Sequence, residues 1–470
     1  MKNTRWLSLL VLCTGFLLIV VDMTIVNVAL PSIGRDLRFT PSGLAWVINA
    51  YLVAFAGLLL LAGRLADLAG GKRVFLAGLA IFTGASLLCG LSTSQWMLIA
   101  ARFVQGVGGA TSSAVILAMI VGLFPEPEEQ AKAFGVFSFV ASAGAAVGLL
   151  AGGLLTQAVS WHWIFFVNLP IGIITAVLGY RLLPAGRALG LRQGADVLGG
   201  ALVTASLMLG VYAIVSASPL FGLVATALLG AFLVRQARAR RPLLPLRIFR
   251  SRKLSGANAV QALMSAGFLS FFFVASLDLE RVLGYGPLAL GLAFLPVALV
   301  MGGFSIRFAA QLVMRFGAFR VLLAGQAVVA AGLLAVGLGP EHALYARDLL
   351  VPMALLGLGG GLSFPALTLI AMSEAAPEDS GLASGLLNTT GQVGGALGLA
   401  VLATVAAGRT AGLAASGAAP LAALASGYHL AWLASAVIVV ATIGLAVATL
   451  RPRPAVTGLA VAQLDEEAAA

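Results

Sequence analysis

Long apolar stretches constrain this chain more than any other feature of its sequence. A helix needs about 20 mostly apolar residues to cross the hydrocarbon core of a bilayer. Backbone polar groups find no water there, so such stretches fold as helices. The sequence therefore predicts an all-α integral membrane protein with fourteen transmembrane helices. They are expected near residues 7–30, 44–62, 74–91, 96–122, 133–158, 163–183, 197–215, 218–234, 255–277, 287–308, 318–338, 348–372, 381–407 and 428–450.

The composition excludes a soluble globular protein. Hydrophobic residues make up 60% of the chain and charged residues only 10%, whereas about a quarter of the residues in a soluble domain are charged. The excess of apolar surface would not stay in solution. The net charge of +11 is spread over many short connections, which favours cytoplasmic loop charge over nucleic-acid binding.

The first apolar stretch follows Lys2 and Arg5, as the apolar region of a signal peptide follows its basic residues. It is longer than such a region, contains Asp22 and lacks a clear cleavage site, so we interpret it as an uncleaved first helix. Cys13 and Cys89 both lie in apolar stretches, where a packing role is expected. Neither the cysteines nor the three histidines have metal-binding spacing, so no metal and no cofactor is predicted.

The distribution of lysine and arginine predicts the orientation. With a cytoplasmic N-terminus, 22 of the 28 basic residues fall on the cytoplasmic side and five on the outer side, as the positive-inside rule requires. An even number of helices then places both termini in the cytoplasm, in a multi-pass protein of the inner membrane. The basic run from Arg235 to Lys253 is interpreted as a topology anchor near anionic lipid.

A short internal repeat divides the helices into groups. Arg73–Gly78 recurs as Arg320–Gly325, and Gly106–Ala110 has a counterpart in Gly357–Gly361, at offsets of 247 and 251 residues. Two repeated bundles around a midplane site are typical of secondary transporters. We therefore expect an N-terminal six-helix bundle at 1–183, two intervening helices with a basic cytoplasmic loop at 184–254, and a C-terminal six-helix bundle with a short tail at 255–470.

Only two charged residues, Asp22 and Arg102, lie deep inside apolar stretches. A charge at the bilayer centre costs at least about 2.5–3.5 kcal/mol on insertion scales, so a function is expected for both. Asp22 precedes Pro31 by nine residues and Arg102 follows Trp96 by six, which puts them about 13 Å and 9 Å from the outer ends of their helices. The pair is either a static structural contact or a proton-coupling site, in which Asp22 binds and releases a proton and Arg102 tunes it.

The connection between the second and third stretches reads Gly63-Arg-Leu-Ala-Asp67-Leu-Ala-Gly70-Gly-Lys72-Arg73. Glycines allow a sharp turn close to neighbouring helices. Asp67 can accept hydrogen bonds from amides at a helix start, and Lys72 and Arg73 can hold a phosphate or an acid. The spacing favours a gating loop over a generic basic turn.

This loop resembles the signature loop of the major facilitator superfamily. Four further segments resemble helix motifs of its fourteen-span drug:proton antiporters, the EmrB/QacA kind: Asp22–Pro31, Arg102–Gly109, Trp161–Gly172 and Asp196–Gly199. Three positions depart from the basic residues usual in the family, namely Leu68, Gly71 and His162.

The fifth stretch resembles the antiporter motif of the same family through Gly144, Gly148, Gly152 and Gly153, with Leu149 where proline is usual. Glycines four residues apart line one face of a helix. They indicate either ordinary close packing or an interface that slides or hinges between two states.

Several polar and aromatic residues are candidates for substrate contact. Aromatic rings and amides in a cavity suit large, apolar and often cationic molecules, although core packing or a lipid-facing position is an open alternative for each. The candidates are Asn27, Gln105, Asn258, Gln261, Phe272, Asn388 and Gln392. Asp278 and Glu280, at the outer end of the ninth stretch, are secondary candidates for carrying a proton.

The resemblance implies a monomeric, proton-coupled antiporter that exports amphipathic or toxic small molecules by alternating access within membrane lipid. A transporter of the same fold that exports a lipid or an endogenous metabolite is the alternative. No convergent nucleophile and base or metal cluster suggests an enzyme, and one acid–base pair in a two-bundle repeat argues against a channel. No nucleotide-binding loop is present, so ATP is not the expected energy source.

Overall fold

The computed structural model describes residues 2–184, 196–239, 242–340, 343–373 and 380–451. As predicted, these described residues form an all-helical protein without strands. Among them, thirteen helices are long and apolar enough to cross a membrane. A further helix, α5 (Pro127–Ala158), carries a shorter apolar segment at Ala143–Ala158.

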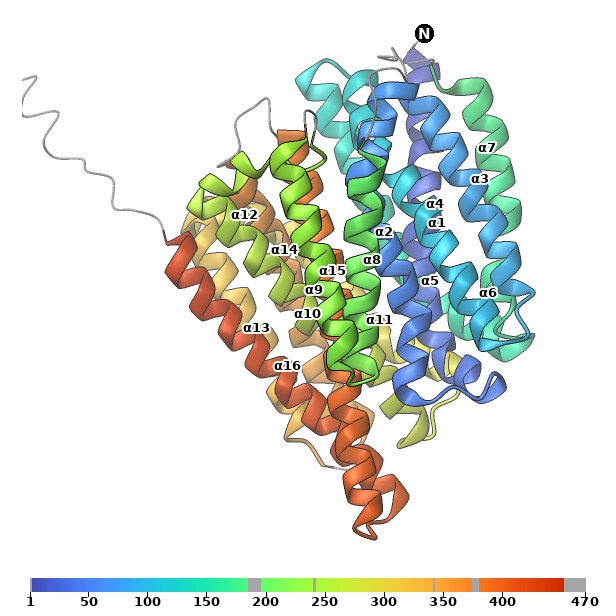
Figure 1. The fold of residues 1–470 in the computed structure, drawn as a ribbon, viewed down its shortest axis with the longest axis vertical. Helices are drawn as coiled ribbons and strands as arrows, with labels where there is room; N and C mark the ends of the chain where they lie inside the picture. The colour runs from blue at the N-terminus through green and yellow to red at the C-terminus, as the bar shows by residue number, and fades with distance from the viewer. Residues whose placement is uncertain (1, 185–195, 240–241, 341–342, 374–379, 452–470) are drawn as a thin grey trace, which may run out of the picture.

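The first seven helices pack together on one side of the molecule, blue to teal in Figure 1. They are α1 (Lys2–Asp36), α2 (Pro41–Ala69), α3 (Gly71–Gly90), α4 (Gln95–Leu123), α5, α6 (Trp163–Phe166) and α7 (Asn168–Leu182). Pro31 was expected at the outer end of the first helix, but α1 continues through it to Asp36. Packing against neighbouring helices allows a membrane helix to tolerate an internal proline.

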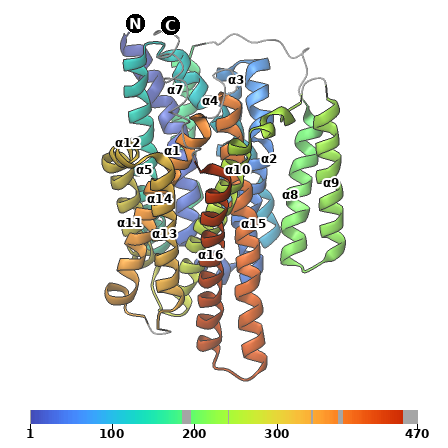
Figure 2. The same ribbon diagram turned by 90° about the vertical axis from the view of Figure 1, so that its left-hand side faces the viewer.

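Two helices, α8 (Val197–Val215) and α9 (Pro219–Arg238), stand side by side at one edge of the molecule in Figure 2. Asp196 caps α8 by accepting a hydrogen bond from the Gly199 amide, and Arg235 and Gln236 of α9 donate to the same carboxylate at 2.5 and 2.8 Å. Burial alone would raise the pKa of Asp196, but these hydrogen bonds and the Arg235 charge hold it below its ordinary value. The carboxylate therefore ties the start of α8 to the end of α9.

The remaining helices form the other side of the molecule. They are α10 (Arg252–Arg281), α11 (Pro287–Phe304), α12 (Ala310–Phe316), α13 (Ala318–Gly337), α14 (Leu350–Ser373), α15 (Ser380–Ala415) and α16 (Pro420–Leu450), with short 3-10 or π turns at Leu246–Arg250, Ser305–Ala309 and Tyr345–Leu349. α8 packs against both α2 and α15, so it spans the boundary between the two sides.

A long connection was expected at 408–427, and this prediction is wrong. α15 runs to Ala415 and α16 begins at Pro420, and both views show this hairpin extending beyond the other helices. The segment is rich in alanine, the residue with the highest helix propensity. Its weaker hydropathy therefore marks a change of surroundings and not the end of a helix.

The sequence repeat recurs as a repeat of local geometry. Gly70, between α2 and α3, has φ +94°, and Gly317, between α12 and α13, has φ +82°, a backbone region that favours glycine. Eight residues further on, Gly78 packs against Gly108 and Ser112, as Gly325 packs against Gly359 and Ser363. In both pairs a side chain in place of the first glycine would overlap the facing helix. The same close helix contact is thus built twice.

Candidate functional site

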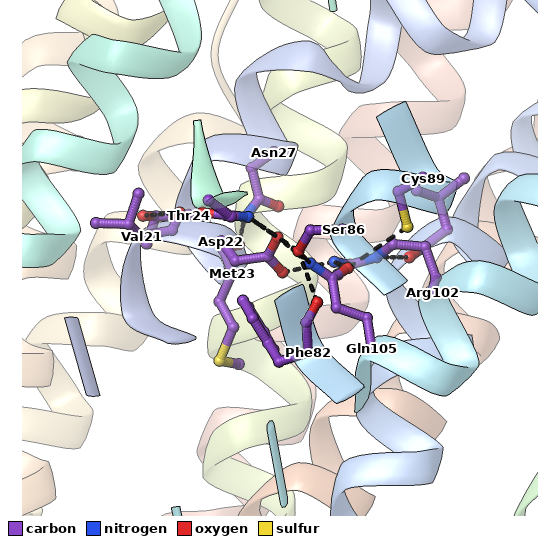
Figure 3. A network of polar contacts seen from close by, with 12 residues as sticks. Val21, Asp22, Met23, Thr24, Asn27, Phe82, Ser86, Cys89, Arg102 and Gln105 are labelled. Atoms are coloured by element: carbon purple, nitrogen blue, oxygen red, sulfur yellow. Dashed lines mark hydrogen bonds and ion pairs between the residues drawn. The ribbon is translucent and has the colours of Figure 1, made fainter. Parts of the chain in front are cut away.

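Asp22 of α1 and Arg102 of α4 are in direct contact. Arg102 Nη1 donates to Asp22 Oδ2 at 2.5 Å. Asp22 is 0% exposed and Arg102 is 1% exposed, so the pair is removed from solvent. Figure 3 shows the two side chains within one network of polar contacts.

Two amide side chains complete the surroundings of the carboxylate. Gln105, one turn after Arg102, donates through Nε2 to Asp22 Oδ1 at 2.7 Å, and Asn168 of α7 donates to the same oxygen at 3.2 Å. The Ser86 hydroxyl of α3 accepts hydrogen bonds from both amides. Asp22 is therefore held from α4 and α7, with α3 supporting the donors.

The guanidinium of Arg102 has further partners. Its Nε donates to the Val47 carbonyl of α2 at 2.9 Å, and Nη1 also donates to Gln105 Oε1 at 2.6 Å. The Tyr51 ring lies 4.4 Å from the guanidinium carbon, close enough for a cation–π contact. Cys89 donates a weak hydrogen bond to Gln105 Oε1 at 3.6 Å.

This environment explains how a buried ion pair is tolerated. Removing two charges from water costs several kcal/mol each, and attraction compensates only when the remaining donors and acceptors are satisfied. Here both carboxylate oxygens and two of the three guanidinium nitrogens have partners. Neutralising either charge would leave the partners of the other unsatisfied.

Sequence reasoning placed Gln105 beside Arg102 but missed Ser86, Tyr51 and Asn168. Asn168 lies within the sixth-helix motif, and that motif was the available signal for it. Ser86 and Cys89, three residues apart on α3, had only their shared helix face as a signal. No signal in the sequence indicated the Val47 carbonyl, because every residue type has a backbone carbonyl.

The gating loop is shorter than predicted. α2 continues to Ala69 and α3 starts at Gly71, so the left-handed Gly70 is the whole connection and Gly63 lies within α2. Lys72 donates to the Tyr180 carbonyl near the end of α7 at 2.7 Å, where a helix C-terminus attracts positive charge. Arg73 is exposed. The side chain of Asp67 lies outside the described part of the structure.

The four glycines of α5 divide between two interfaces. Gly144, Gly148 and Gly152 pack against α1, where added side chains would overlap Leu17, Thr24 and Ile25 respectively. Gly153 instead faces the backbone of Pro287 and Leu288 at the start of α11.

The contact between α5 and α11 is close from both sides. The facing Gly291 of α11 leaves room for the Leu149 carbonyl, and Leu149 itself is buried. Leu149, which replaces the usual proline, therefore lies in the only one of these glycine contacts that joins the two sides of the molecule.

An ion pair also joins the two sides. Arg35, near the end of α1, pairs with Glu280, near the end of α10. Glu280 is mostly buried, with a side chain that is 10% exposed. Together with the contact of α5 and α11, this pair closes the molecule at the end where α1 terminates.

The amide candidates for substrate contact are positioned differently. Asn258 accepts from Thr390 at 3.0 Å and Gln261 donates to Ser265 at 3.2 Å, so both are engaged within the protein. Asn27 donates to the Met23 carbonyl of its own helix. Asn388 is exposed and Gln392 is half-buried, one turn apart on α15.

Phe272 belongs to an aromatic cluster. Its ring centroid lies 5.5 Å from those of Phe268 and Phe294 and 5.6 Å from that of Phe271. Phe272 is half-buried, whereas its three partners are buried. It is the member of the cluster with a face left for another molecule.

Relatives of this chain are transport and resistance proteins. The puromycin resistance protein of Streptomyces alboniger is 40% identical over 418 residues, covering 87% of this chain and 83% of its own length. The cephamycin export protein of Amycolatopsis lactamdurans is 39% identical over 464 residues, covering 96% and 92%. The tetracenomycin C resistance and export protein of Streptomyces glaucescens is 33% identical over 420 residues, covering 87% and 77%.

Solved transporters share the fold. A bacterial homologue of the human lysosomal transporter Spinster, in an inward-facing and occupied conformation, superimposes with a TM-score of 0.71 at 15% identity, covering 97% of this chain and 100% of that one. A peptide transporter gives a TM-score of 0.68 at 18% identity, covering 97% and 99%. The Major Facilitator Superfamily matches residues 12–399. This chain is thus a multi-pass membrane transporter that belongs to the Major Facilitator Superfamily.

Proposed function

We propose that this chain is a proton-coupled antiporter of the inner membrane that exports amphipathic or toxic small molecules by alternating access. The buried pair of Asp22 and Arg102, which has hydrogen-bond partners on α2, α4 and α7, is the observation that carries the proposal. The names of the relatives, which refer to puromycin, cephamycin and tetracenomycin C, support export of toxic compounds.

Asp22 is the proposed proton-binding residue. As a carboxylate it neutralises Arg102 and accepts three hydrogen bonds. Protonation removes its charge and turns one oxygen from an acceptor into a donor, which weakens the bonds from α4 and α7. A proton that binds one arrangement of these helices better than another shifts the conformational equilibrium towards it.

The proposed architecture is that of the fourteen-span antiporters, with bundles at 1–183 and 255–470, two helices at 184–254 and both termini in the cytoplasm. The repeated contacts of Gly78 and Gly325 support two related bundles. In a monomer, these bundles would rock about the contacts of α1 with α10 and of α5 with α11. The residues of the gating loop would act at the opposite end of the molecule, by changing the equilibrium between the two conformations of the bundles. They are Gly63, Asp67, Gly70, Lys72 and Arg73.

We assign direct substrate contact to Asn27, Phe272, Asn388 and Gln392, which keep accessible surface. Gln105, Asn258 and Gln261 would act by positioning helices, since their amides are already engaged. This division follows from the burial of each side chain and from its hydrogen bonds to other side chains.

One observation favours a lipid as an alternative substrate. A cavity of about 200 Å³ lies among α10, α15 and α16, with Phe273, Leu277, Ala403 and Leu424 in its lining. Apolar walls of this kind suit an acyl chain. Export assays should therefore include labelled lipid beside dyes and antibiotics.

The decisive experiment is export in proteoliposomes with and without an imposed pH gradient. Asp22→Asn fixes a neutral side chain, so accumulation against a gradient should be lost while substrate binding remains. Asp36→Asn is the matched control: it lies on the same helix, and its carboxylate contacts Trp161 instead of Arg102. Gradient-driven accumulation at the wild-type rate by Asp22→Asn would refute the assignment.

Arg102→Ala should change the same assay in a different way. Without the guanidinium, the Asp22 carboxylate loses its counter-charge and one of its three donors, so the pH dependence of transport should change. An unchanged pH profile with a lower melting temperature would indicate a static structural pair.

A further inference from the structure

Asp278 lies near the outer end of α10, two residues before Glu280. Glu280 is engaged with Arg35. Asp278 is only 5% exposed, and no hydrogen bond to its side chain is made within the described residues. A buried carboxyl group without a protein partner calls for another partner, so the two neighbouring acids differ in what they can do.

A small cavity adjoins Asp278. Its volume is about 10 Å³, and its lining includes Asp278, Asp348, His429 and Trp432. Such a volume is close to the smallest that holds one water molecule. Trp432 is 98% buried, since its exposure is 2%, and its indole Nε1–H has no hydrogen-bond partner among the described residues. The cavity therefore combines room for one water with an indole donor and a carboxylate that make no hydrogen bond within that part of the chain.

The other lining residues lead towards the outer surface. Asp348 belongs to the turn before α14, where it accepts from the Leu344 amide at 2.8 Å and pairs with the exposed Arg347. Its side chain is 17% exposed. His429 is half-buried near the start of α16, with its ring 5.7 Å from that of Trp432. Groups able to transfer a proton thus extend from Asp278 to the surface.

The described titratable and charged groups around the cavity come from α10, α16 and the turn before α14, while Glu341 and His342 lie outside the described residues. Arg281 and Glu280 flank Asp278 on α10, Tyr428 and His429 lie on α16, and Arg347 adjoins Asp348. Arg281 reaches across to α1, since its Nη2 lies 3.5 Å from the position of a side chain at Gly34. The charge of Asp278 therefore lies beside the residues that join α10 to α1.

We propose that this cavity is an outer proton-binding site, in which one water links Asp278 to Asp348 and His429. A hydronium ion outside protonates Asp348 or His429, the bound water passes a proton on, and Asp278 becomes a neutral carboxyl group. Each transfer breaks one bond to hydrogen and forms one, and the positive charge ends by cancelling the charge of Asp278. No group of three potential metal ligands occurs in the described residues, and the volume suits water.

This inference rests on the proposed proton coupling and adds an entry point for the proton from the outer side. A proton could reach Asp278 by this route while α1 stays in contact with α10 and α5 stays in contact with α11. Loss of the Asp278 charge would then alter the surroundings of Arg281 and Glu280, and so link outer protonation to the ion pair with Arg35.

The test measures export rate against external pH at constant internal pH, in oriented proteoliposomes. Asp278→Asn should abolish the response to external pH that the wild type shows, and substrate binding should persist. The double variant Asp348→Asn with His429→Gln keeps Asp278 but removes its route, and should slow the response to an external pH jump. Asp36→Asn removes another outer acid and should respond as the wild type does.

A wild-type response to external pH in both Asp278→Asn and the double variant would overturn the inference. The proposed function fails separately, when the wild type shows no response to a pH gradient or Asp22→Asn keeps full coupling. Asp278→Glu provides an independent check, because restoring a carboxyl group should restore part of the pH response, whereas a merely structural role would not.

Discussion

At the scale of residues, the decisive feature is that one carboxylate on α1 accepts hydrogen bonds from three side chains on two other helices. Asp22 accepts from Arg102, Gln105 and Asn168. An arginine alone would supply charge, but the two amides also fix which oxygen faces which helix. The orientation of the carboxylate is therefore determined partly by uncharged neighbours.

Asn168→Leu tests this arrangement. It deletes the donor from α7 and leaves Asp22 Oδ1 with one partner fewer, which should cost about 1–3 kcal/mol. We expect a lower melting temperature and a changed pH profile of export, measured in the same vesicles. Thr14→Val, on the same helix and bonded to the Leu10 carbonyl within α1, is the comparison. Identical pH profiles for the wild type and Asn168→Leu would show that α7 does not contribute to coupling.

At the scale of elements, close helix contacts depend on glycine. α3 and α4 approach so closely that a side chain at Gly108 would overlap the Phe82 backbone, while nothing lies within 4 Å of one at Gly122. Both glycines lie in α4. The two positions therefore differ mainly in how closely the neighbouring helix packs against them.

Gly108→Ala should therefore be destabilised by overpacking, by about 1–3 kcal/mol. Gly122→Ala should be neutral or more stable, because alanine favours a helix over glycine by about 1 kcal/mol. Melting temperatures in detergent decide between them. Equal shifts in melting temperature for the two variants would mean that α3 and α4 can move apart at little cost in stability.

At the scale of the whole molecule, the two sides meet near the end of α1 through Arg35 with Glu280 and through the glycine contacts of α5 with α11. The packing contact is close because backbone faces backbone. The ion pair is adjustable, since Arg35 is 64% exposed on its side chain, and solvent limits such a pair to about 1 kcal/mol or less.

Arg35→Glu replaces attraction with repulsion and should raise the population in which the two sides are separated at this end. Spin labels near Ala158 at the end of α5 and near Pro287 at the start of α11 would report this as a longer distance. The exchanged double variant, Arg35→Glu with Glu280→Arg, should restore the wild-type distribution. If the single variant leaves the distances unchanged, the ion pair is a surface contact without influence on the equilibrium.

The sequence by itself determined the all-α membrane class and predicted a shared role for Asp22 and Arg102. Both follow from the cost of placing polar groups in hydrocarbon, which local composition reports. The superfamily was indicated separately, by the resemblance of its motifs. The sequence also located a short repeat from matching residues. In the structure, Gly70 and Gly317 precede the two copies and share a positive φ, a conformation that favours glycine.

Only the tertiary structure decided which residues meet. Ser86, Asn168 and the Val47 carbonyl join Asp22 and Arg102 because five segments converge there, and a hydrogen-bond partner distant along the chain leaves no periodic trace in sequence. The helix ends at Asp36 and Ala415 escaped prediction because hydropathy reports the membrane boundary, while packing and propensity extend a helix past it. The different surroundings of Asp278 and Glu280, two residues apart, arise from the helices that face them, and no local pattern encodes those neighbours.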